Sequence, residues 1–196
     1  MNTPITPENI KVRAQETPNP NALRFIVNFE LIDHGNATFT SPEQAQGMPM
    51  IESLFMVEGV NQVYFFENTL TVTHSGLMDN ETMKASIVAV IQTRLPIHKT
   101  DFQSPEAKTK QYAVKDRSEL SPELKNIEEI LDRTIRPGLQ ADGGDLEVLS
   151  FENNELRVLY MGACGGCPSA TMGTLDAIQN ILRYELDNPE IFVIPV

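Results

Sequence analysis

The cysteines of this chain lie together in one segment, Cys164-Gly165-Gly166-Cys167-Pro168, and the 196 residues contain no others. Two residues between the cysteines place both sulfur atoms on one tight loop, where they can bind a single metal centre. The glycines give little steric cover and tolerate positive φ, so backbone N–H groups can turn toward sulfur. We expect the loop between a strand and a helix, whose positive end favours thiolates. The segment is therefore suited to hold anionic sulfur.

This spacing leaves several kinds of chemistry open. Iron–sulfur clusters are bound by thiolates and tuned by hydrogen bonds to sulfur. A thiol–disulfide oxidoreductase also carries a Cys-x-x-Cys pair between a strand and a helix. A structural zinc site takes four ligands, commonly with a second such pair or two histidines. A thiol loop without a chemical role is the fourth alternative.

The number of available ligands limits how an iron–sulfur cluster could be bound. Clusters with two or four irons usually take four thiolates, and one chain supplies two, Cys164 and Cys167. We expect the three histidines, His34, His74 and His98, at the solvated surface or in turns rather than at a metal. If a cluster binds, two chains must each contribute both cysteines. That count predicts a cluster-bridged homodimer with twofold symmetry.

The elements that must position the loop are predicted in the second half of the chain. Ser121-Pro122-Glu123 has the N-cap and first-turn residues of a helix, which Pro137-Gly138 is expected to close. Asn153-Asn154 predicts a hairpin, and a second helix follows the cysteines. Three strands are expected: Leu146–Phe151, Glu155–Tyr160 and Ile191–Val196. The order αββαβ predicts two helices on one face of a three-stranded sheet, without the parallel crossover of an oxidoreductase.

Charged residues near the loop have ordinary structural interpretations. Asp142-Gly143-Gly144-Asp145 is typical of a tight turn before a strand. The acidic stretch from Glu128-Glu129 to Asp132 is expected on an exposed helix face. Pro168 is expected to set the start of the second helix.

The first half predicts an α+β unit in the order ββαββα. Asp79 is the expected N-cap of its last helix, which ends before Pro96. Strands are expected at Ile10–Gln15, Ala22–Phe29, Val60–Phe66 and Thr69–His74, with a helix around Ile51, Leu54 and Phe55. The polar stretch His98–Ser118 lacks apolar periodicity. We therefore expect two small α+β domains, residues 1–100 and 119–196, joined by a linker at 101–118.

Composition excludes several classes of function. With 15 basic and 27 acidic residues the net charge is −12, which argues against binding nucleic acid or an anionic membrane. We see no signal segment or membrane span, so we expect a soluble protein of a reducing compartment, most simply a bacterial cytoplasm. No carboxylate pair, Ser/His/Asp set or phosphate-binding glycine loop is recognisable, so we do not expect an enzyme.

Longer segments resemble a known family. The sequences at Gly138–Asp145 (GLQADGGD) and Gly162–Ser169 (GACGGCPS) resemble the NifU-like, or Nfu-type, iron–sulfur cluster domain over roughly Glu119–Val196. Thr17–Phe25 (TPNPNALRF) and Thr69–Thr73 (TLTVT) resemble the N-terminal domain of two-domain Nfu proteins. Leu54-Phe55 and Glu58-Gly59-Val60 also match that domain. Together the two matches span nearly the whole chain.

The resemblance implies a function. Members of the family are scaffolds or carriers that accept a [4Fe–4S] cluster from upstream assembly proteins and transfer it to apo iron–sulfur proteins. Cys164 and Cys167 match the family's cluster ligands. A cluster shared between two subunits would then be passed on by ligand exchange, and the oxidoreductase remains the alternative.

Overall fold

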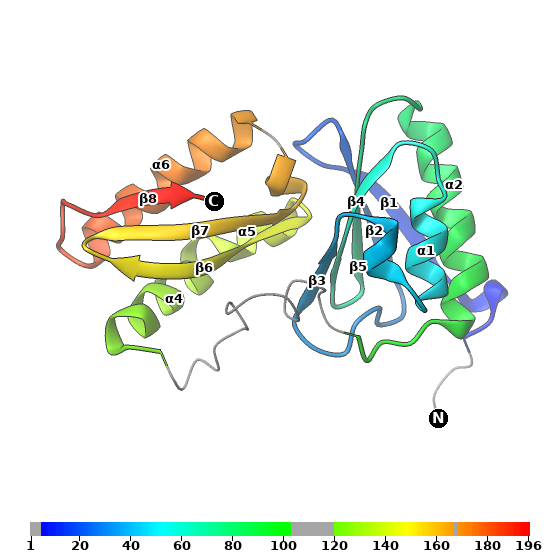
Figure 1. Cartoon of the computed structure of the whole chain (residues 1–196), viewed down its shortest axis with the longest axis horizontal. Coiled ribbons are helices and arrows are strands. Elements are labelled where there is room, and N and C mark those ends of the chain that lie inside the picture. Colours follow the sequence, from blue (N-terminus) through cyan, green and yellow to red (C-terminus); the bar gives the residue numbers. More distant parts are fainter. Residues whose placement is uncertain (1–4, 103–119, 167) are drawn as a thin grey trace.

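The computed structural model describes residues 5–102, 120–166 and 168–196, with the backbone alone for 166 and 168–172, and shows two α+β domains (Figure 1). The N-terminal domain contains a five-stranded antiparallel sheet in the order β1-β2-β5-β4-β3. The C-terminal domain contains a three-stranded sheet in the order β6-β7-β8. The predicted α+β class with two small domains is confirmed.

The N-terminal domain follows most of the predicted pattern. Its elements are β1 (Val12–Glu16), β2 (Ala22–Val27), β3 (Asn36–Phe39), α1 (Pro49–Phe55), β4 (Val60–Phe66), β5 (Thr69–His74) and α2 (Asn80–Arg94), with 3-10 turns at Pro7–Asn9, Pro42–Ala45 and Leu95–Ile97. The β4–β5 hairpin has the predicted bounds. Asp79 caps α2, because its Oδ1 accepts a hydrogen bond from the Thr82 N–H at 3.0 Å.

Strand β3 was not predicted, so the observed order is βββαββα rather than ββαββα. This strand has only four residues and pairs antiparallel with β4, with Ala37 opposite Phe65 and Phe39 opposite Val63. Its conformation depends on a neighbour more than twenty residues away in the sequence. A four-residue segment with two apolar positions carries too little local signal to predict it.

The core of the N-terminal domain lies between the sheet and one helical layer. Helices α1 and α2 cover the face of the sheet that points away from the C-terminal domain (Figure 1). Residues Met83, Ile87 and Ile91 of α2 are fully buried against this face. Phe102 also packs against the core, and the Asp33 N–H donates to the Thr100 carbonyl at 3.0 Å. The chain therefore stays in contact with this domain as far as residue 102, and most of the predicted linker, 103–118, lies outside the described residues.

The C-terminal domain has one more helix than predicted. Its elements are α4 (Pro122–Thr134), α5 (Arg136–Ala141), β6 (Gly144–Glu152), β7 (Glu155–Gly162), the 3-10 turn η5 (Ala163–Gly166), α6 (Pro168–Glu185) and β8 (Phe192–Pro195). Ser121 caps α4 as expected, accepting from the Leu124 N–H at 3.2 Å. Pro137-Gly138 does not close the helical region. It lies in the first turn of α5, where a proline loses no hydrogen bond.

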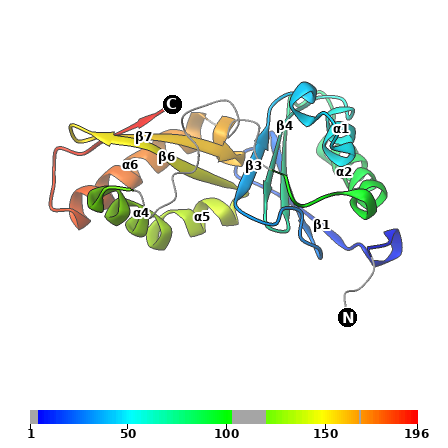
Figure 2. The ribbon, with the colours of Figure 1, turned by 60° about the horizontal axis from the view of Figure 1, so that its bottom comes forward.

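The three helices lie on one face of the small sheet (Figure 2). Strands β6 and β7 form the predicted hairpin, with Asn153 at φ 52° and Asn154 at φ 65° in its turn. Strands β7 and β8 pair in parallel through the crossover helix α6, with Leu156 opposite Val193. The expectation that this order lacks a parallel crossover is therefore wrong. Topology alone does not exclude an oxidoreductase.

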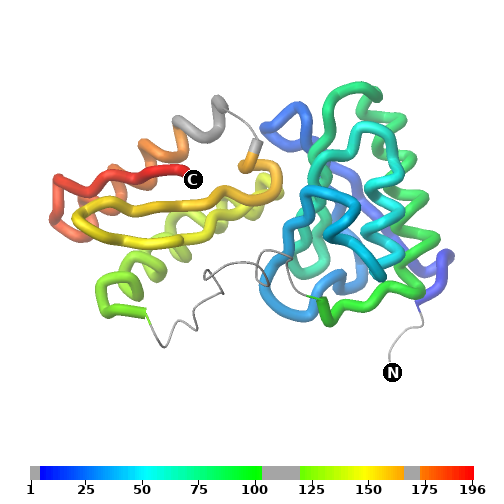
Figure 3. The backbone as a smooth tube through the Cα atoms, viewed as in Figure 1, coloured from blue at the N-terminus to red at the C-terminus, as the bar shows by residue number. Residues whose placement is uncertain are grey.

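The domains meet where the β6–β7 hairpin ends. Figure 3 shows this hairpin, in yellow, running from its tight turn to the N-terminal sheet, so that β7 contacts β4 and β5, and η5 contacts β5. The face of the N-terminal sheet that it reaches is opposite α1 and α2 (Figure 2). In the part of the chain that the structure describes, no helix is both long and apolar enough to cross a membrane.

Candidate functional site

The predicted ligand loop lies between β7 and α6. Cys164 is in its 3-10 turn, where it is 8% exposed and packs with the C-terminal core. The Ala163 N–H donates to the Gly143 carbonyl at 3.1 Å, which ties the loop to the turn before β6. Cys167 lies outside the described residues. The structure therefore places one of the two predicted ligands.

Glycines shape the space around Cys164. A Cβ atom on Gly144 would lie 2.5 Å from Cys164 Sγ and 2.9 Å from its backbone N, which is closer than any real Cβ contact. Gly143 (φ +82°) adopts a left-handed conformation that L-residues rarely take. The Asp-Gly-Gly-Asp segment thus forms a turn, as predicted. Beyond that prediction, Gly144 leaves the room that the cysteine sulfur occupies.

The N-terminal domain contacts the same loop from outside. Three of its side chains donate hydrogen bonds to main-chain carbonyls of the C-terminal domain: Asn19 Nδ2 to Ala163 at 3.0 Å, Gln62 Nε2 to Gly162 at 3.4 Å, and Arg24 Nη1 to Ala141 at 2.6 Å. Two of these carbonyls belong to the residues directly before Cys164. The third begins the turn that holds Gly143.

A row of polar side chains on the N-terminal sheet completes this contact. Arg24, Thr71 and Tyr64 lie opposite one another on the adjacent strands β2, β5 and β4. A Cβ atom on Gly143 would lie 2.9 Å from Thr71 Oγ1, and one on Gly162 would lie 2.8 Å from Tyr64 Cδ1. The two domains therefore pack closely where the C-terminal side has no side chains. We call Asn19, Arg24, Gln62, Tyr64 and Thr71 the loop-facing surface.

Several polar groups at this contact are buried without hydrogen bonds. The hydroxyls of Tyr64 and Thr71 and the Nε of Arg24 have no partner among the described residues. A buried polar group left unpaired destabilises by about 1–3 kcal/mol. Burial raises the pKa of Tyr64 well above its ordinary value, and the nearby Asp145 carboxylate adds to the effect. Tyr64 is therefore a neutral hydroxyl at physiological pH.

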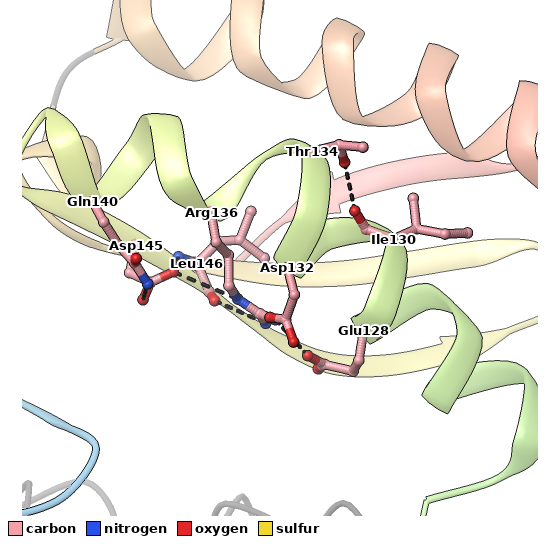
Figure 4. A network of polar contacts seen from close by, with 8 residues as sticks. All are labelled: Glu128, Ile130, Asp132, Thr134, Arg136, Gln140, Asp145 and Leu146. Carbon is pink, nitrogen blue, oxygen red and sulfur yellow. Dashed lines mark hydrogen bonds and ion pairs between the residues drawn. The ribbon is translucent and has the colours of Figure 1, made fainter.

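A network of charges lies on the C-terminal domain beside the turn (Figure 4). Arg136 forms ion pairs with Glu128 at 2.7 Å, with Asp132, and with Asp145 at 3.6 Å. The side chains of Arg136 and Glu128 are 11% exposed. Burial alone would lower the pKa of Arg136, but its ion pairs with Glu128 and Asp132 raise it. The guanidinium therefore holds a buried cluster in which carboxylates outnumber the positive charge.

The network shows that the predicted exposure of Glu128 is wrong, and it contains Arg136, for which no role was predicted from the sequence. Glu128 was expected on an exposed face, but it is 9% exposed because Arg136, two helical turns later, reaches back to it. Burial raises the pKa of Asp145, whose Oδ2 accepts a hydrogen bond from Gln140 Nε2 at 3.1 Å. Arg136 was not singled out from the sequence. The i, i+4, i+8 spacing of Glu128, Asp132 and Arg136 is the signal that could have indicated it.

The network lines a cleft of about 810 Å³ that also borders β3 and β4, and Cys164 is not among the lining residues. In the stretches 5–102, 120–166 and 168–196, no group of three or more His, Cys, Asp or Glu side chains is arranged to hold a metal ion. The carboxylates of the network are already engaged by Arg136. The cleft and the cysteine loop are thus separate features.

None of the three histidines belongs to a metal-holding group among the described residues. His34 is exposed, as expected. His74 is buried, with its Nδ1 accepting from the Gly76 N–H at 3.2 Å, so its predicted solvated position is wrong. His98 stacks on Phe65 and its Nε2 lies 2.8 Å from the Leu31 carbonyl. Burial lowers the pKa of both His74 and His98.

Comparison with known proteins identifies both halves. Residues 127–193 match the model of the NifU-like domain, and residues 12–97 match that of the Nfu/NifU scaffold protein N-terminal domain. The chain is 32% identical over 185 residues to the human mitochondrial NFU1 iron–sulfur cluster scaffold homolog, covering 92% of this chain and 69% of that protein. It is 32% identical to the Drosophila ananassae protein of the same name, covering 93% of this chain and 63% of that protein.

A plant relative supports the same family assignment. The chain is 31% identical to the mitochondrial NifU-like protein 4 of Arabidopsis thaliana, covering 88% of this chain and 62% of that protein. The chain therefore spans about two thirds of the length of these relatives. All three are mitochondrial proteins of eukaryotes. The expectation of a bacterial cytoplasm, which rested on the lack of a recognisable signal segment or membrane span, is therefore wrong.

Proposed function

Because this chain belongs to the Nfu/NifU family of iron–sulfur cluster scaffold proteins, we propose that it binds an iron–sulfur cluster as cargo and transfers it to apo-proteins. The relatives are named as scaffolds. Its partners are then apo iron–sulfur proteins and the assembly proteins that load it. It acts by holding and releasing cargo rather than as an enzyme.

The cargo we propose is a [4Fe–4S] cluster held by Cys164 and Cys167 from each of two subunits. The observation that carries this proposal is the position of Cys164. It lies in a turn between β7 and α6, beside a glycine that leaves space for its sulfur, inside the segment that matches the NifU-like domain. Two thiolates per chain supply half of a four-thiolate set. A second chain supplies the other half.

Transfer proceeds by exchange of thiolates. An incoming cysteine thiolate of the target forms a bond to one iron as the bond from Cys164 or Cys167 to that iron breaks. The released thiolate takes up a proton, and the oxidation state of the cargo does not change. After four such exchanges the cargo has left both subunits, and the two chains separate.

The alternative, a thiol–disulfide oxidoreductase, is supported by the spacing of the two cysteines alone. The relatives that match this chain are named as iron–sulfur cluster scaffolds, which favours the scaffold function. A zinc-bridged dimer with a purely structural role uses the same four thiolates, and sulfide content distinguishes it.

One experiment separates these functions. The protein is purified anaerobically and incubated with iron and sulfide, and visible absorption, iron and sulfide content and oligomeric mass are recorded. We expect about four irons and four sulfides per dimer for a [4Fe–4S] cluster. A monomer that takes up no sulfide but reduces disulfides rapidly would sink the scaffold proposal.

Single cysteine variants test the ligands. Cys164→Ser and Cys167→Ser should each abolish cluster retention and the dimer that depends on it. Cys164 lies in a 3-10 turn rather than in a strand, so the circular dichroism spectrum should stay that of the parent chain. If either variant retained a full complement of iron and sulfide, that cysteine would not be a ligand.

A further inference from the structure

The loop that must meet a second subunit is already occupied in the single chain. Asn19 and Gln62 bond to the carbonyls of the two residues that precede Cys164. The Tyr64 ring lies against Gly162. This contact involves the β7–η5 end of the C-terminal domain, which approaches β4 and β5 end-on (Figures 1 and 3). A second protein cannot reach the same carbonyls while the N-terminal domain is bound to them.

We propose that the loop-facing surface is a docking surface for the cysteine loop of its own chain, and that it competes with the second subunit for that loop. In the docked arrangement the N-terminal domain is bound to the residues that lead into Cys164, and the chain stays monomeric. For two loops to share one cluster, each N-terminal domain must move away. This proposal rests on the proposed function, because competition matters only if two loops bind one cluster.

The shapes of the two sides support a specific contact. The loop-facing surface supplies the side chains, and the C-terminal domain supplies main-chain carbonyls and glycines. At Gly143 and Gly162 a single added Cβ atom would come within 2.9 Å of Thr71 or Tyr64. Asn19 is 4% exposed, so its bond to Ala163 is shielded from water. Such close packing is typical of a built interface rather than of a chance encounter.

The chemistry of the contact supports reversibility. On the core side of the same sheet, Phe25, Leu70 and Val72 are apolar and fully buried. On the docking side the corresponding positions carry the hydroxyls of Tyr64 and Thr71, which are buried without hydrogen-bond partners among the described residues. Undocking lets water pair with these hydroxyls, which lowers the free energy of the open form. The contact is therefore specific but easily released.

Thiol alkylation measures the docking equilibrium without any cluster. The full-length chain carries Cys167→Ser, so that iodoacetamide reports on Cys164 alone, and modification is followed by mass spectrometry. Arg24→Ala with Gln62→Ala removes two interdomain hydrogen bonds and should raise the alkylation rate about tenfold. Arg13→Ala is the matched control, because this arginine is exposed on the edge strand β1 and should leave the rate unchanged.

A second pair of substitutions should act in the opposite direction. Tyr64→Phe with Thr71→Val removes the unpaired hydroxyls but keeps the ring and the branched side chain. This variant should stabilise docking and lower the alkylation rate about tenfold. A partly unfolded protein would expose Cys164, so slower alkylation cannot arise from misfolding. Equal rates in the parent, the hydrogen-bond variant and the hydroxyl variant would overturn the proposal.

Cluster uptake then tests the competition, with both cysteines restored. The Arg24/Gln62 variant should load iron and sulfide and form dimers faster than the parent, and the Tyr64/Thr71 variant more slowly. Identical loading rates in the three proteins, together with altered alkylation, would show docking without competition and would also overturn the proposal. If the parent takes up no cluster at all, the proposed function fails, while the alkylation rates still decide whether the domains dock.

Discussion

The two domains bury their sheets in different ways. The N-terminal sheet packs on α1 and α2 through a continuous apolar core, in which twenty of the described residues are buried. The C-terminal sheet has thirteen such residues and adds the Arg136 network at its margin. In an apolar core, the loss of one contact lowers the free energy of unfolding in proportion to the apolar area that is no longer buried. A buried charge network instead requires every partner to be present.

Deleting an aromatic ring from the N-terminal core should have the largest effect. Phe65 is fully buried and its ring lies 6.2 Å from Phe39 and 5.3 Å from Phe102. Phe65→Ala should lower the free energy of unfolding of the N-terminal domain by about 3–5 kcal/mol. Urea denaturation followed by circular dichroism measures the loss. Phe192→Ala is the control, because Phe192 is 54% exposed; equal losses in both variants would contradict the assignment of the core.

Removing the positive charge of Arg136 from the C-terminal network should cause the second-largest loss of stability. Arg136→Met leaves Glu128 and Asp145 buried without their positive partner and should destabilise the C-terminal domain by about 3 kcal/mol at pH 7. The loss should shrink as the pH falls, because burial raises the pKa of Asp145, which then takes up a proton and no longer carries unpaired charge.

A second arginine, Arg133, shows whether the loss of stability comes from burial of the ion pairs or from the loss of a charge alone. Arg133 pairs with Glu185 at 2.5 Å, but its side chain is 58% exposed. Arg133→Met should therefore lower the free energy of unfolding by less than about 1 kcal/mol. If the two arginine variants lost the same stability at pH 7, the network would not be a buried structural feature.

Filling the space beside the cysteine should have a smaller effect. A methyl group at residue 144 meets Cys164 Sγ, so Gly144→Ala should destabilise the C-terminal domain by about 1–3 kcal/mol. Adding Cys164→Ala should restore part of the loss, because the smaller side chain makes room. Gly138→Ala is the matched control, since no atom lies within 4 Å of a Cβ there. A loss in Gly144→Ala that Cys164→Ala left untouched would refute the proposed packing.

The smallest effect should be a pH dependence of the stability of the N-terminal domain. Burial lowers the pKa of His74 and His98 in the folded state below the ordinary histidine value. Their contribution to stability is therefore complete above that ordinary value and is lost as the pH falls through the depressed pKa. Urea midpoints at pH 7.5 and 5 should show this loss, and His98→Gln should reduce it. His34→Gln, at an exposed position, is the control for the substitution itself and should leave the urea midpoint at pH 7.5 as it is in the parent.

The fold was predictable where the signal is local. Asp79 and Ser121 cap their helices as their side chains predicted, and Asn153-Asn154 forms the hairpin turn. Strand β3 was missed because its conformation comes from pairing with β4. Helix α5 was missed because Pro137 fits both the end of one helix and the first turn of the next.

The site was predictable only in part, for a related reason. Cys164 was predicted to be a cluster ligand from its spacing to Cys167, and this spacing can be read directly from the sequence. Tyr64 and Thr71 alternate with core residues on their strands, so they have the pattern of ordinary solvent-facing positions. Only the arrangement of the two domains shows that they are covered. Glu128 is buried for a similar reason, because its partner Arg136 is contributed by the next helix.

The hydrogen bonds that Asn19, Arg24 and Gln62 donate to the C-terminal domain end on main-chain carbonyls. Every residue type carries such a carbonyl, so mutations at residues 141 and 163 leave these acceptors in place, whereas the glycines at 143 and 162 must be kept. The two halves of the chain can therefore accumulate substitutions nearly independently during evolution. A chimera that joins this N-terminal domain to another NifU-like domain should accordingly preserve the contact, provided that the two glycines are present.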